Sequence, residues 1–509
     1  MITEVFTAAT FGVDAYIVRV ETHIDPGMHN FSVVGLPDNA VKESRDRVMA
    51  AIKNTGLFFP FVKRVTINLS PADIKKEGSG FDLPIAIGII CETNQVKPDK
   101  VKDYVFAGEL SLDGRLRKIP GVLPIALEAR RKEFKGIILP IGNAKEAAIV
   151  EGLDVFPFET VQEVLGFLND EIIPEPYKLN SREIFEQQNF YAVDFSDVKG
   201  QADVKRGLEV AAAGGHNIIM IGLPGSGKSM LAKRLPTILP PLTLDEALET
   251  TKIHSIAGLL PPDTSLISTR PFRSPHHTAS DVSIVGGGSN AKPGEISFAH
   301  NGVLFLDELT EFKKNVLEVM RQPLEDRVVT ISRSKITVQY PCNFMLVAAM
   351  NPSPAGNIKE QEMYSDNQLQ KNLMKISGPI LDRIDIHIHV NPVNYQELSS
   401  KADSEKSERV RERVIKAREI QIKRFSSIQG VYSNSNMSSK DIKEFCSIDS
   451  DCENLMKMAI TRLGLSARAY DRILKVSRTI ADLAGDEKLK PAHISEAIQY
   501  RSLDRTGWM

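Results

Sequence analysis

Eight residues, 222–229, limit the folds open to this chain more than any other segment. An apolar run at 217–221 has the composition of a buried strand, and 228–235 has that of a helix. Glycines at such a junction let successive backbone N–H groups turn toward bound phosphate, and the N-terminus of a helix favours the same negative charge. The pattern predicts a phosphate-binding loop made of Gly222, Leu223, Pro224, Gly225, Ser226, Gly227, Lys228 and Ser229.

Two side chains of this loop have distinct chemistry. The Lys228 ammonium can reach the β- and γ-phosphates, and the Ser229 hydroxyl can bind Mg²⁺. The alternative is a glycine turn that happens to precede a helix. The strand on one side and the helix on the other favour the loop, so we predict that ATP and Mg²⁺ are the cofactors.

Composition bounds the class of protein. The 509 residues are 42% hydrophobic and 25% charged, which is typical of a soluble protein of three or four domains. A formal net charge of −2 excludes a globally basic nucleic-acid binder.

The N-terminus has no basic region followed by an apolar run, and no uncharged stretch approaches about 20 apolar residues, so we expect neither a signal peptide nor a membrane span. The four cysteines show no metal or disulfide pattern, and we expect packed free thiols in a cytoplasmic protein.

The pattern along the chain predicts three domains. Residues 1–170 form an α/β domain, with strands expected at 15–21 and 64–69 and helices at 41–55 and 84–91. Residues 171–189 form a polar linker. Residues 190–395 alternate strand-like and helix-like runs, which is typical of a mostly parallel sheet with helices on both faces. Residues 396–509 are helical, with helices expected at 407–425, 466–483 and 492–501.

A second apolar strand ends in two acids. Residues 303–306 are followed by Asp307 and Glu308. We expect this strand to lie beside the one that leads into the phosphate loop. Asp307 would then hold Mg²⁺, and Glu308 would polarise the attacking water as a general base.

Three further polar residues are candidates for the same chemistry. Asn351 follows the apolar run 346–350 and could hydrogen-bond the water or the γ-phosphate, although these residues alone favour an Asn-Pro turn that ends the strand. Arg383 could act as an arginine finger on a neighbouring subunit, or form a surface ion pair. Arg468 opens the helix expected at 466–483 and could reach the same phosphate, or form an ion pair at the helix start.

The order of these motifs resembles that of AAA+ ATPases, with 197–201 similar to their adenine-side entry. More narrowly, the chain resembles the magnesium-chelatase-like ComM/YifB family from about residue 7 to residue 503. The similarity is carried by Ser-Pro-His-His-Thr-Ala-Ser at 274–280, Gly-Glu-Ile-Ser at 294–297, Ala-His-Asn-Gly-Val-Leu-Phe-Leu-Asp-Glu at 299–308 and Ser-Gly-Pro-Ile-Leu-Asp-Arg-Ile-Asp at 377–385.

This resemblance implies a homo-oligomeric ring, usually a hexamer, with active sites at subunit boundaries and a helical lid. It makes Asn351 sensor 1, Arg383 the arginine finger and Arg468 sensor 2. It also implies an insert at 270–290, whose glycines at 286–288 suit a flexible pore-facing tip, and a hairpin at 326–341.

For function, the resemblance implies a DNA translocase or helicase on single-stranded or branched DNA, acting in branch migration during recombination or transformation. Basic side chains of the hairpin, Arg327, Arg333 and Lys335, could meet a phosphate backbone, or simply be solvated. The alternative is a chelatase-type or protein-remodelling motor that does not act on DNA.

Residues 1–170 resemble the proteolytic (S5 domain 2-like) domain of Lon proteases, through 76–80 and 106–115. The serine position falls on Gly80 or Phe81, and the lysine position falls near 123–124, which offers no base. Ser79 and Lys76 remain formal substitutes for a Ser-Lys dyad. We therefore expect a catalytically inactive module for binding or ring assembly.

Metal binding is not expected. His254, His276, His277 and His300 are joined by no cysteine, and adjacent histidines point in different directions on a strand or helix. ComM-like relatives often carry a zinc-type cysteine cluster after sensor 1. This chain has no cysteine between Asn351 and Arg383, so zinc is not expected there either.

Overall fold

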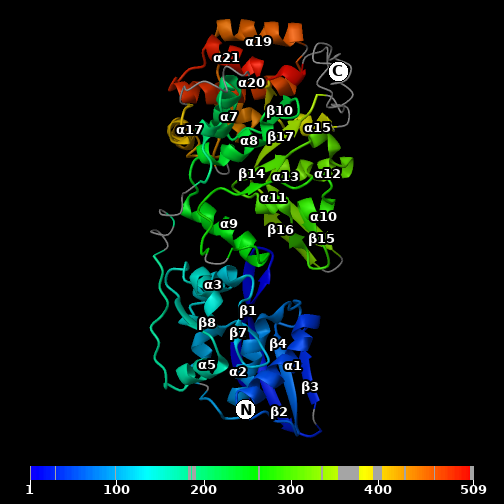
Figure 1. Ribbon diagram of the computed structural model, residues 1–509, viewed down its shortest axis with the longest axis vertical. Helices are drawn as coiled ribbons and strands as arrows, with labels where there is room; N and C mark the ends of the chain where they lie inside the picture. The colour runs from blue at the N-terminus through cyan, green and yellow to red at the C-terminus, as the bar shows by residue number, and fades with distance from the viewer. Residues whose placement is uncertain are drawn as a thin grey trace. The chain divides into compact units, whose positions relative to one another are not determined.

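The structure is a computed structural model, shown in Figure 1. It describes residues 2–28, 30–97, 99–180, 185, 191–261, 264–333, 336–352, 376, 378–393, 404–428, 431–463 and 465–504. The chain forms two compact units. The first contains 1–188 and 244–268, and the second contains 189–243 and 269–509. No described helix is long and apolar enough to cross a membrane.

The first unit is built on a seven-stranded mixed sheet in the order β3-β4-β2-β1-β5-β8-β9. Its strands are β1 (Thr3–Phe11), β2 (Asp14–Pro26), β3 (Asn30–Val34), β4 (Lys63–Ser70), β5 (Tyr104–Phe106), β8 (Gly136–Pro140) and β9 (Asp154–Phe158). A short hairpin joins β6 (Glu109–Leu110) to β7 (Leu116–Arg117). Strand β1 is antiparallel to β2 and parallel to β5.

Helices cover both faces of this sheet. They are α1 (Asn39–Asn54), α2 (Asp82–Glu92), α3 (Val122–Arg131), α4 (Ala144–Ala147) and α5 (Val161–Leu168), and α9 (Leu244–Ile256) packs on α3. Neighbouring strand residues alternate between two cores: Ile138 packs in the core that contains α1 and α2, whereas Ile137 and Leu139 pack in the core that contains α3. This alternation follows from the period of two along a strand.

Helix α9 belongs to this unit although it follows the phosphate-loop helix in the sequence. The buried Glu146 explains the attachment, because its carboxylate accepts hydrogen bonds from the Ser255 hydroxyl of α9 at 2.5 Å and from the Leu123 N–H of α3 at 3.0 Å. Gly121 N–H donates to the Ser255 carbonyl at 3.0 Å. The sequence analysis placed this helix within 190–395. The domain limits at 170, 190 and 395 stay predictions.

The second unit contains a five-stranded sheet in which every pair is parallel, in the order β11-β14-β17-β10-β18. Its strands are β11 (Phe272–Arg273), β14 (Val303–Leu306), β17 (Met345–Met350), β10 (Ile218–Gly222) and β18 (Ile386–Val390). The helices of the same region are α7 (Ala202–Gly214), α8 (Lys228–Arg234), α10 (Asp281–Val285), α11 (Glu295–Phe298), α12 (Lys314–Val319), α13 (Arg321–Asp326) and α15 (Gly378–Leu381). The prediction of a parallel sheet is confirmed.

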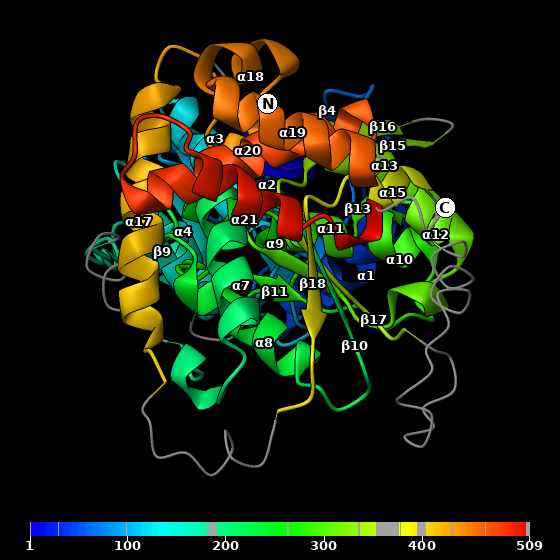
Figure 2. The ribbon, with the colours of Figure 1, turned by 90° about the horizontal axis from the view of Figure 1, so that it is seen from above.

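The C-terminal region is helical, as predicted. It contains α17 (Ser407–Arg424), α18 (Ser439–Phe445), α19 (Ser450–Leu463), α20 (Ala467–Ala484) and α21 (Pro491–Gln499). These helices share one hydrophobic core with α7 and the parallel sheet, so the lid is part of the second unit. Figure 2 shows α17, α20 and α21 close to α7, and residues of α17 and α20 contact α7.

A buried polar network joins the lid to the sheet. His216, which precedes β10, places Nδ1 2.9 Å from Asp385 Oδ2 and Nε2 2.8 Å from Thr479 Oγ1 of α20. Arg472 of α20 donates to Asp385 Oδ1 at 3.3 Å. Burial raises the pKa of Asp385, but the nearby His216, Arg472 and Lys475 outweigh burial and lower that pKa from 3.8 to about 2.

We expect Asp385→Asn to lower the free energy of unfolding at pH 7 by about 2–4 kcal/mol, because it removes the carboxylate charge that offsets the neighbouring Arg472 and Lys475. The folded pKa lies below the unfolded one, so the contribution of the carboxylate is present above about pH 4 and is lost as the pH falls through about 2. Urea unfolding of the variant and the wild type between pH 7 and pH 3 checks this, at about one-unit steps. The difference in the free energy of unfolding between wild type and variant should shrink as the pH falls. A difference that does not change with pH would contradict the role given to the Asp385 carboxylate. Asp451→Asn, an exposed change on α19, is the control.

Candidate nucleotide site

The strand order brings together the polar residues that follow three strands, β10, β14 and β17. Strand β17 lies between β10 and β14, pairing with both. The expectation that β14 lies directly beside β10 is therefore wrong. Parallel neighbours need not follow each other in sequence, because each connection crosses over a face of the sheet. Since β17 occupies the middle, Asn351 at its end lies between the phosphate loop and Asp307.

The phosphate loop connects β10 to α8 as predicted, although the strand is Ile218–Gly222 and the α-helix ends at Arg234 before a 3₁₀ turn, Leu235–Ile238. Glycine is required at 222, where a Cβ would lie 2.3 Å from the Val390 carbonyl oxygen. Gly225 and Gly227 adopt φ of +79° and +94°, and each has open space where a side chain would project. The buried Ser226 hydroxyl has no hydrogen-bond partner among the described residues. An open cradle with an unsatisfied donor suits an anionic ligand.

Hydrogen bonds hold the Lys228 side chain at the carboxyl ends of these strands. Its ammonium donates to the Gly222 and Leu223 carbonyls at 2.7 and 2.9 Å and to Asn351 Oδ1 at 3.1 Å. Burial lowers the pKa of Lys228, and the carboxylates of Asp307 and Glu308 oppose that shift. The predicted proximity of Asn351 to the phosphate loop is thus observed, whereas its role as sensor 1 stays a prediction.

Ser229 and Asp307, the predicted metal-binding pair, are also adjacent. The Ser229 hydroxyl donates to Asp307 Oδ2 at 2.7 Å, and the other carboxylate oxygen accepts from the Glu308 N–H at 3.0 Å. A hydroxyl and a carboxylate oxygen are ligands of the type that Mg²⁺ prefers. The residues present therefore fit the predicted cation.

Glu308 follows Asp307 with φ of +52°, in the left-handed region that few non-glycine residues adopt. Its side chain is about half exposed, and its Oε2 lies 3.1 Å from His277 Nδ1. This contact was not expected from the sequence, in which the histidines were considered as metal ligands. The nearness of two residues 31 positions apart depends on how the insert folds, and the sequence gives no signal of it.

Arg383 and Arg468 lie in a second cluster. Arg383 forms an ion pair with Glu325 of α13, and Arg468 forms one with Asp382. Burial and the neighbouring cations Arg321, Arg472 and Arg468 lower the pKa of Arg383. The structure thus brings Arg383 and Arg468 into one cluster, in which each arginine forms an ion pair with a carboxylate. Their assignments as arginine finger and sensor 2 stay predictions.

The insert and the predicted hairpin pack together. Strands β15 (Val328–Arg333) and β16 (Ile336–Pro341) pair antiparallel, so the hairpin is confirmed. The Tyr340 hydroxyl donates to the Ala291 carbonyl at 3.0 Å. The tip expected to be flexible is paired instead: β12 (Gly286–Gly287) forms a ladder with β13 (Lys292–Pro293).

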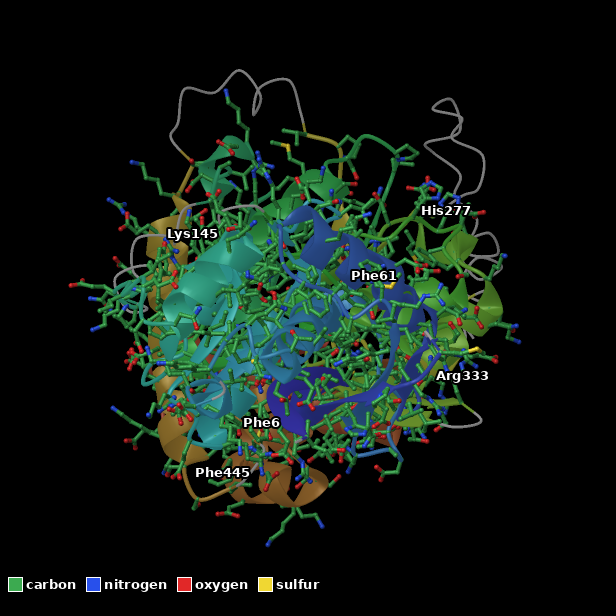
Figure 3. The ribbon with its side chains drawn as sticks, turned by 90° about the horizontal axis from the view of Figure 1, so that it is seen from below. Phe6, Phe61, Lys145, His277, Arg333 and Phe445 are labelled. Carbon is green, nitrogen blue, oxygen red and sulfur yellow. The ribbon has the colours of Figure 1, made fainter. Side chains whose placement is uncertain are left out.

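Glycine is needed in this ladder because a Cβ on Gly286 would lie 2.5 Å from the Lys292 carbonyl oxygen. Among the predicted phosphate contacts, Arg333 is exposed and is labelled in Figure 3. Arg327 is partly buried, and burial lowers its pKa. Lys335 lies outside the described residues.

The N-terminal unit shows no joined Ser-Lys pair at the positions considered. The Ser79 hydroxyl bonds to Glu109, whereas the buried Lys76 ammonium donates to the Ile74 carbonyl at 2.7 Å and to the Pro71 carbonyl. Both groups therefore serve the local fold. Gly80 and Phe81, the two positions considered for the serine, lie in a 3₁₀ turn, Ser79–Phe81, and 123–124 lie in α3.

The four cysteines are buried free thiols, as predicted. Among the described residues, no group of three or more His, Cys, Asp or Glu side chains could hold a metal ion. The cysteine-free segment after Asn351 lies largely outside the described residues.

Comparison with known proteins shows the family to which the chain belongs. Three family models match in succession: magnesium chelatase subunit ChlI at 194–398, subunit ChlI of Mg-chelatase at 20–143, and the ChlI C-terminal region at 404–501. The chain is 43% identical over 506 residues to competence protein ComM of Haemophilus influenzae, covering 98% of this chain and 97% of the relative. It belongs to the magnesium-chelatase-like ComM/YifB family.

A second full-length relative is the protein YifB of Escherichia coli, 42% identical over 507 residues, with 98% of this chain and 97% of the relative covered. A more distant similarity, 26% over 159 residues, is to Lon protease 1 of Hydrogenovibrio crunogenus, covering 29% of this chain and 19% of that protein. The ComM/YifB assignment confirms the family expected from the motifs. The distant Lon similarity is weak support for the Lon-like interpretation of residues 1–170.

Proposed function

We propose that this ComM/YifB-type protein is a Mg²⁺-dependent ATPase of the AAA+ class. The observation that carries the proposal is the convergence of two hydrogen-bonded pairs at the carboxyl ends of a parallel sheet, Lys228 with Asn351 and Ser229 with Asp307. Ligands of open α/β sheets bind outside the carboxyl ends of the strands, where the direction of the strand order reverses. Strand β10 lies at such a point, because the next strands of the chain, β11, β14 and β17, lie on one side of it in the sheet. The last strand, β18, lies on its other side.

Each residue has a definite task in this proposal. Lys228 and the backbone N–H groups of the loop bind the phosphates, and Asn351 orients the γ-phosphate or the attacking water. Glu308 accepts the proton of that water. Mg²⁺, held by Ser229 and Asp307, would neutralise charge on the β- and γ-phosphates.

We further propose that the protein works as a ring, with six subunits the favoured number. The support is the arginine cluster formed by Arg321, Arg383, Arg468 and Arg472, whose mutual repulsion contributes to lowering the pKa of Arg383. A group of like charges attracts a further anion even where its members already pair with carboxylates, as Arg383 does with Glu325 and Arg468 with Asp382. A nucleotide bound to the neighbouring subunit would supply that anion, with Arg383 as the arginine finger and Arg468 as sensor 2.

DNA, single-stranded or branched, is the proposed polymer, with branch migration in recombination or transformation as the process. The name of the Haemophilus influenzae relative, a competence protein, supports this. The exposed Arg333 of the hairpin and Lys292 of β13 provide positive charge for a phosphate backbone. We also propose a cytoplasmic location, because buried free thiols suit a reducing compartment.

The second candidate is a chelatase-type or protein-remodelling motor. It is favoured by the three family models, each of which describes a magnesium chelatase subunit. For the first unit we propose a binding or assembly module with a Lon-type fold and no peptidase activity, because Ser79 and Lys76 are engaged with other partners.

DNA-dependent ATP turnover separates the two candidates. We expect single-stranded or branched DNA to raise turnover of the full chain several-fold at about 50 mM salt, with the gain falling steeply by about 200 mM. Arg333→Ala should reduce the stimulation, and Arg462→Ala, an exposed change on α19, should leave it intact. Turnover that DNA leaves unchanged at low salt contradicts the DNA motor and favours the chelatase-type candidate.

A further inference from the structure

Arg383, the residue proposed as the arginine finger, lies at the end of the sheet opposite to the phosphate loop of its own chain. Strands β10 and β18 run parallel and side by side, with residues 218–222 opposite 386–390 (Figure 2). Arg383 comes before β18, whereas the loop comes after β10. The ladder between these two ends is about 13 Å long, at about 3.3 Å per residue. This position suits a residue that acts on the nucleotide of another subunit.

Asn217, the residue before β10, holds the turn that carries Arg383. Its Nδ2 donates to the Arg383 carbonyl at 2.9 Å, and its own carbonyl accepts from the N–H groups of Asp385 at 2.9 Å and Ile386 at 3.1 Å. The side-chain oxygen Oδ1 accepts from the Leu346 N–H at 2.8 Å. A carbonyl only accepts and an N–H only donates, so these partners fix the orientation of the amide. One side chain thus joins the Arg383 turn to β17, on the other side of β10.

The charges around Arg383 explain why its backbone needs an anchor. The guanidinium pairs with Glu325, and three neighbouring arginines repel it. Because like charges push each other apart, the direction of the guanidinium depends on how firmly the backbone beneath it is held. The turn is short, since the Arg383 N–H donates to the Ile380 carbonyl at 2.9 Å and β18 begins three residues later. The hydrogen bond from Asn217 to the Arg383 carbonyl attaches this turn to the sheet.

We propose that Asn217 is a positioning residue for Arg383. Its side-chain amide fixes the peptide group of Arg383 to the sheet, and the guanidinium is thereby directed at the γ-phosphate of the nucleotide in the neighbouring subunit. The bond of the same amide to β17 ties this turn to the strand at the centre of the sheet. The inference rests on the proposed ring ATPase and adds to it a residue that acts through Arg383.

Asn217→Asp tests the hydrogen bond to Arg383 by itself. The carboxylate still accepts from the Leu346 N–H, but its second oxygen faces the Arg383 carbonyl and cannot donate. We expect kcat for ATP to fall about 10- to 100-fold, while KM and the affinity for a fluorescent ATP analogue stay within about threefold of the wild-type values. Asn343→Asp makes the same chemical change at an exposed residue two positions before β17 and should behave as the wild type does.

Mixed rings show whether the loss lies in the finger. In this proposal an Asn217→Asp subunit has a defective finger and an intact phosphate site, whereas a Glu308→Gln subunit has the opposite defects. An equal mixture of the two, each nearly inactive alone, should recover up to about one quarter of the wild-type turnover, because half of the sites can hydrolyse and half of these receive an intact finger. A defect confined to the fold or the phosphate site of the Asn217→Asp subunit gives no recovery. Arg383→Ala mixed with Glu308→Gln is the positive control.

The outcomes separate this inference from the function on which it rests. A wild type without ATP turnover overturns the proposed ATPase. No recovery in the Arg383→Ala mixture overturns the shared finger, and the inference with it. Recovery there but none with Asn217→Asp, or an Asn217→Asp variant as active as Asn343→Asp, overturns the positioning role alone. If Asn217→Asp fails to bind the ATP analogue, Asn217→Ser, which removes the amide without adding charge, takes its place, and the same two results overturn the role.

Discussion

Lys228→Ala is expected to lower ATP turnover by about 100-fold or more, because the ammonium is the fixed positive charge at the edge where phosphate would bind. Its three acceptors, the Gly222 and Leu223 carbonyls and Asn351 Oδ1, hold it in place before any ligand arrives. Losing one charge-assisted contact of about 1.5–3 kcal/mol should also weaken nucleotide binding by about 10- to 100-fold. Turnover and binding of a fluorescent ATP analogue measure the two effects separately.

The matched control is Lys233→Ala, which removes an exposed lysine from the same helix, α8. It should leave both quantities close to those of the wild type. Equal losses in the two variants would show that the defect comes from the helix rather than from a phosphate contact, and would remove Lys228 from the proposed role.

Glu308→Gln is expected to separate binding from chemistry. The amide keeps the shape of the side chain but cannot accept a proton, so turnover should fall by about 100- to 10,000-fold. Nucleotide affinity should stay within about threefold of the wild-type value, because in the proposed site Lys228, Ser229 and Asp307 carry the binding. Single-turnover hydrolysis measures the chemical step, and equilibrium binding measures nucleotide affinity.

Glu318→Gln, an exposed change on α12, serves as the control for loss of one carboxylate in this region. If Glu308→Gln hydrolyses ATP at the rate of the control, another group is the base.

Local patterns carried much of what could be predicted from the sequence. The strand, glycine turn and helix around Lys228 were found because each has its own short-range signal: an apolar run, glycines that permit positive φ, and a helical run. The same holds for α17, which begins at the predicted residue 407 and ends one residue before the predicted boundary.

Long-range pairing could not be predicted in this way. Nothing local in 345–350 says that β17 lies between β10 and β14, because strand order depends on the crossovers that connect the strands. The attachment of α9 to the first unit depends on a buried hydrogen bond from Ser255 to Glu146, residues 109 positions apart. The Glu308 contact with His277 depends in the same way on the fold of the insert.

The central claim is that a nucleoside triphosphate is bound by the 222–229 loop and cleaved with a divalent cation held by Ser229 and Asp307. Its most direct test is the release of inorganic phosphate from ATP by the purified full-length chain, with Mg²⁺ and with the cation chelated, in the presence and absence of DNA. We expect release that requires Mg²⁺ and is lost in Lys228→Ala. The absence of any release, or release that continues at the same rate without the cation, would contradict the account.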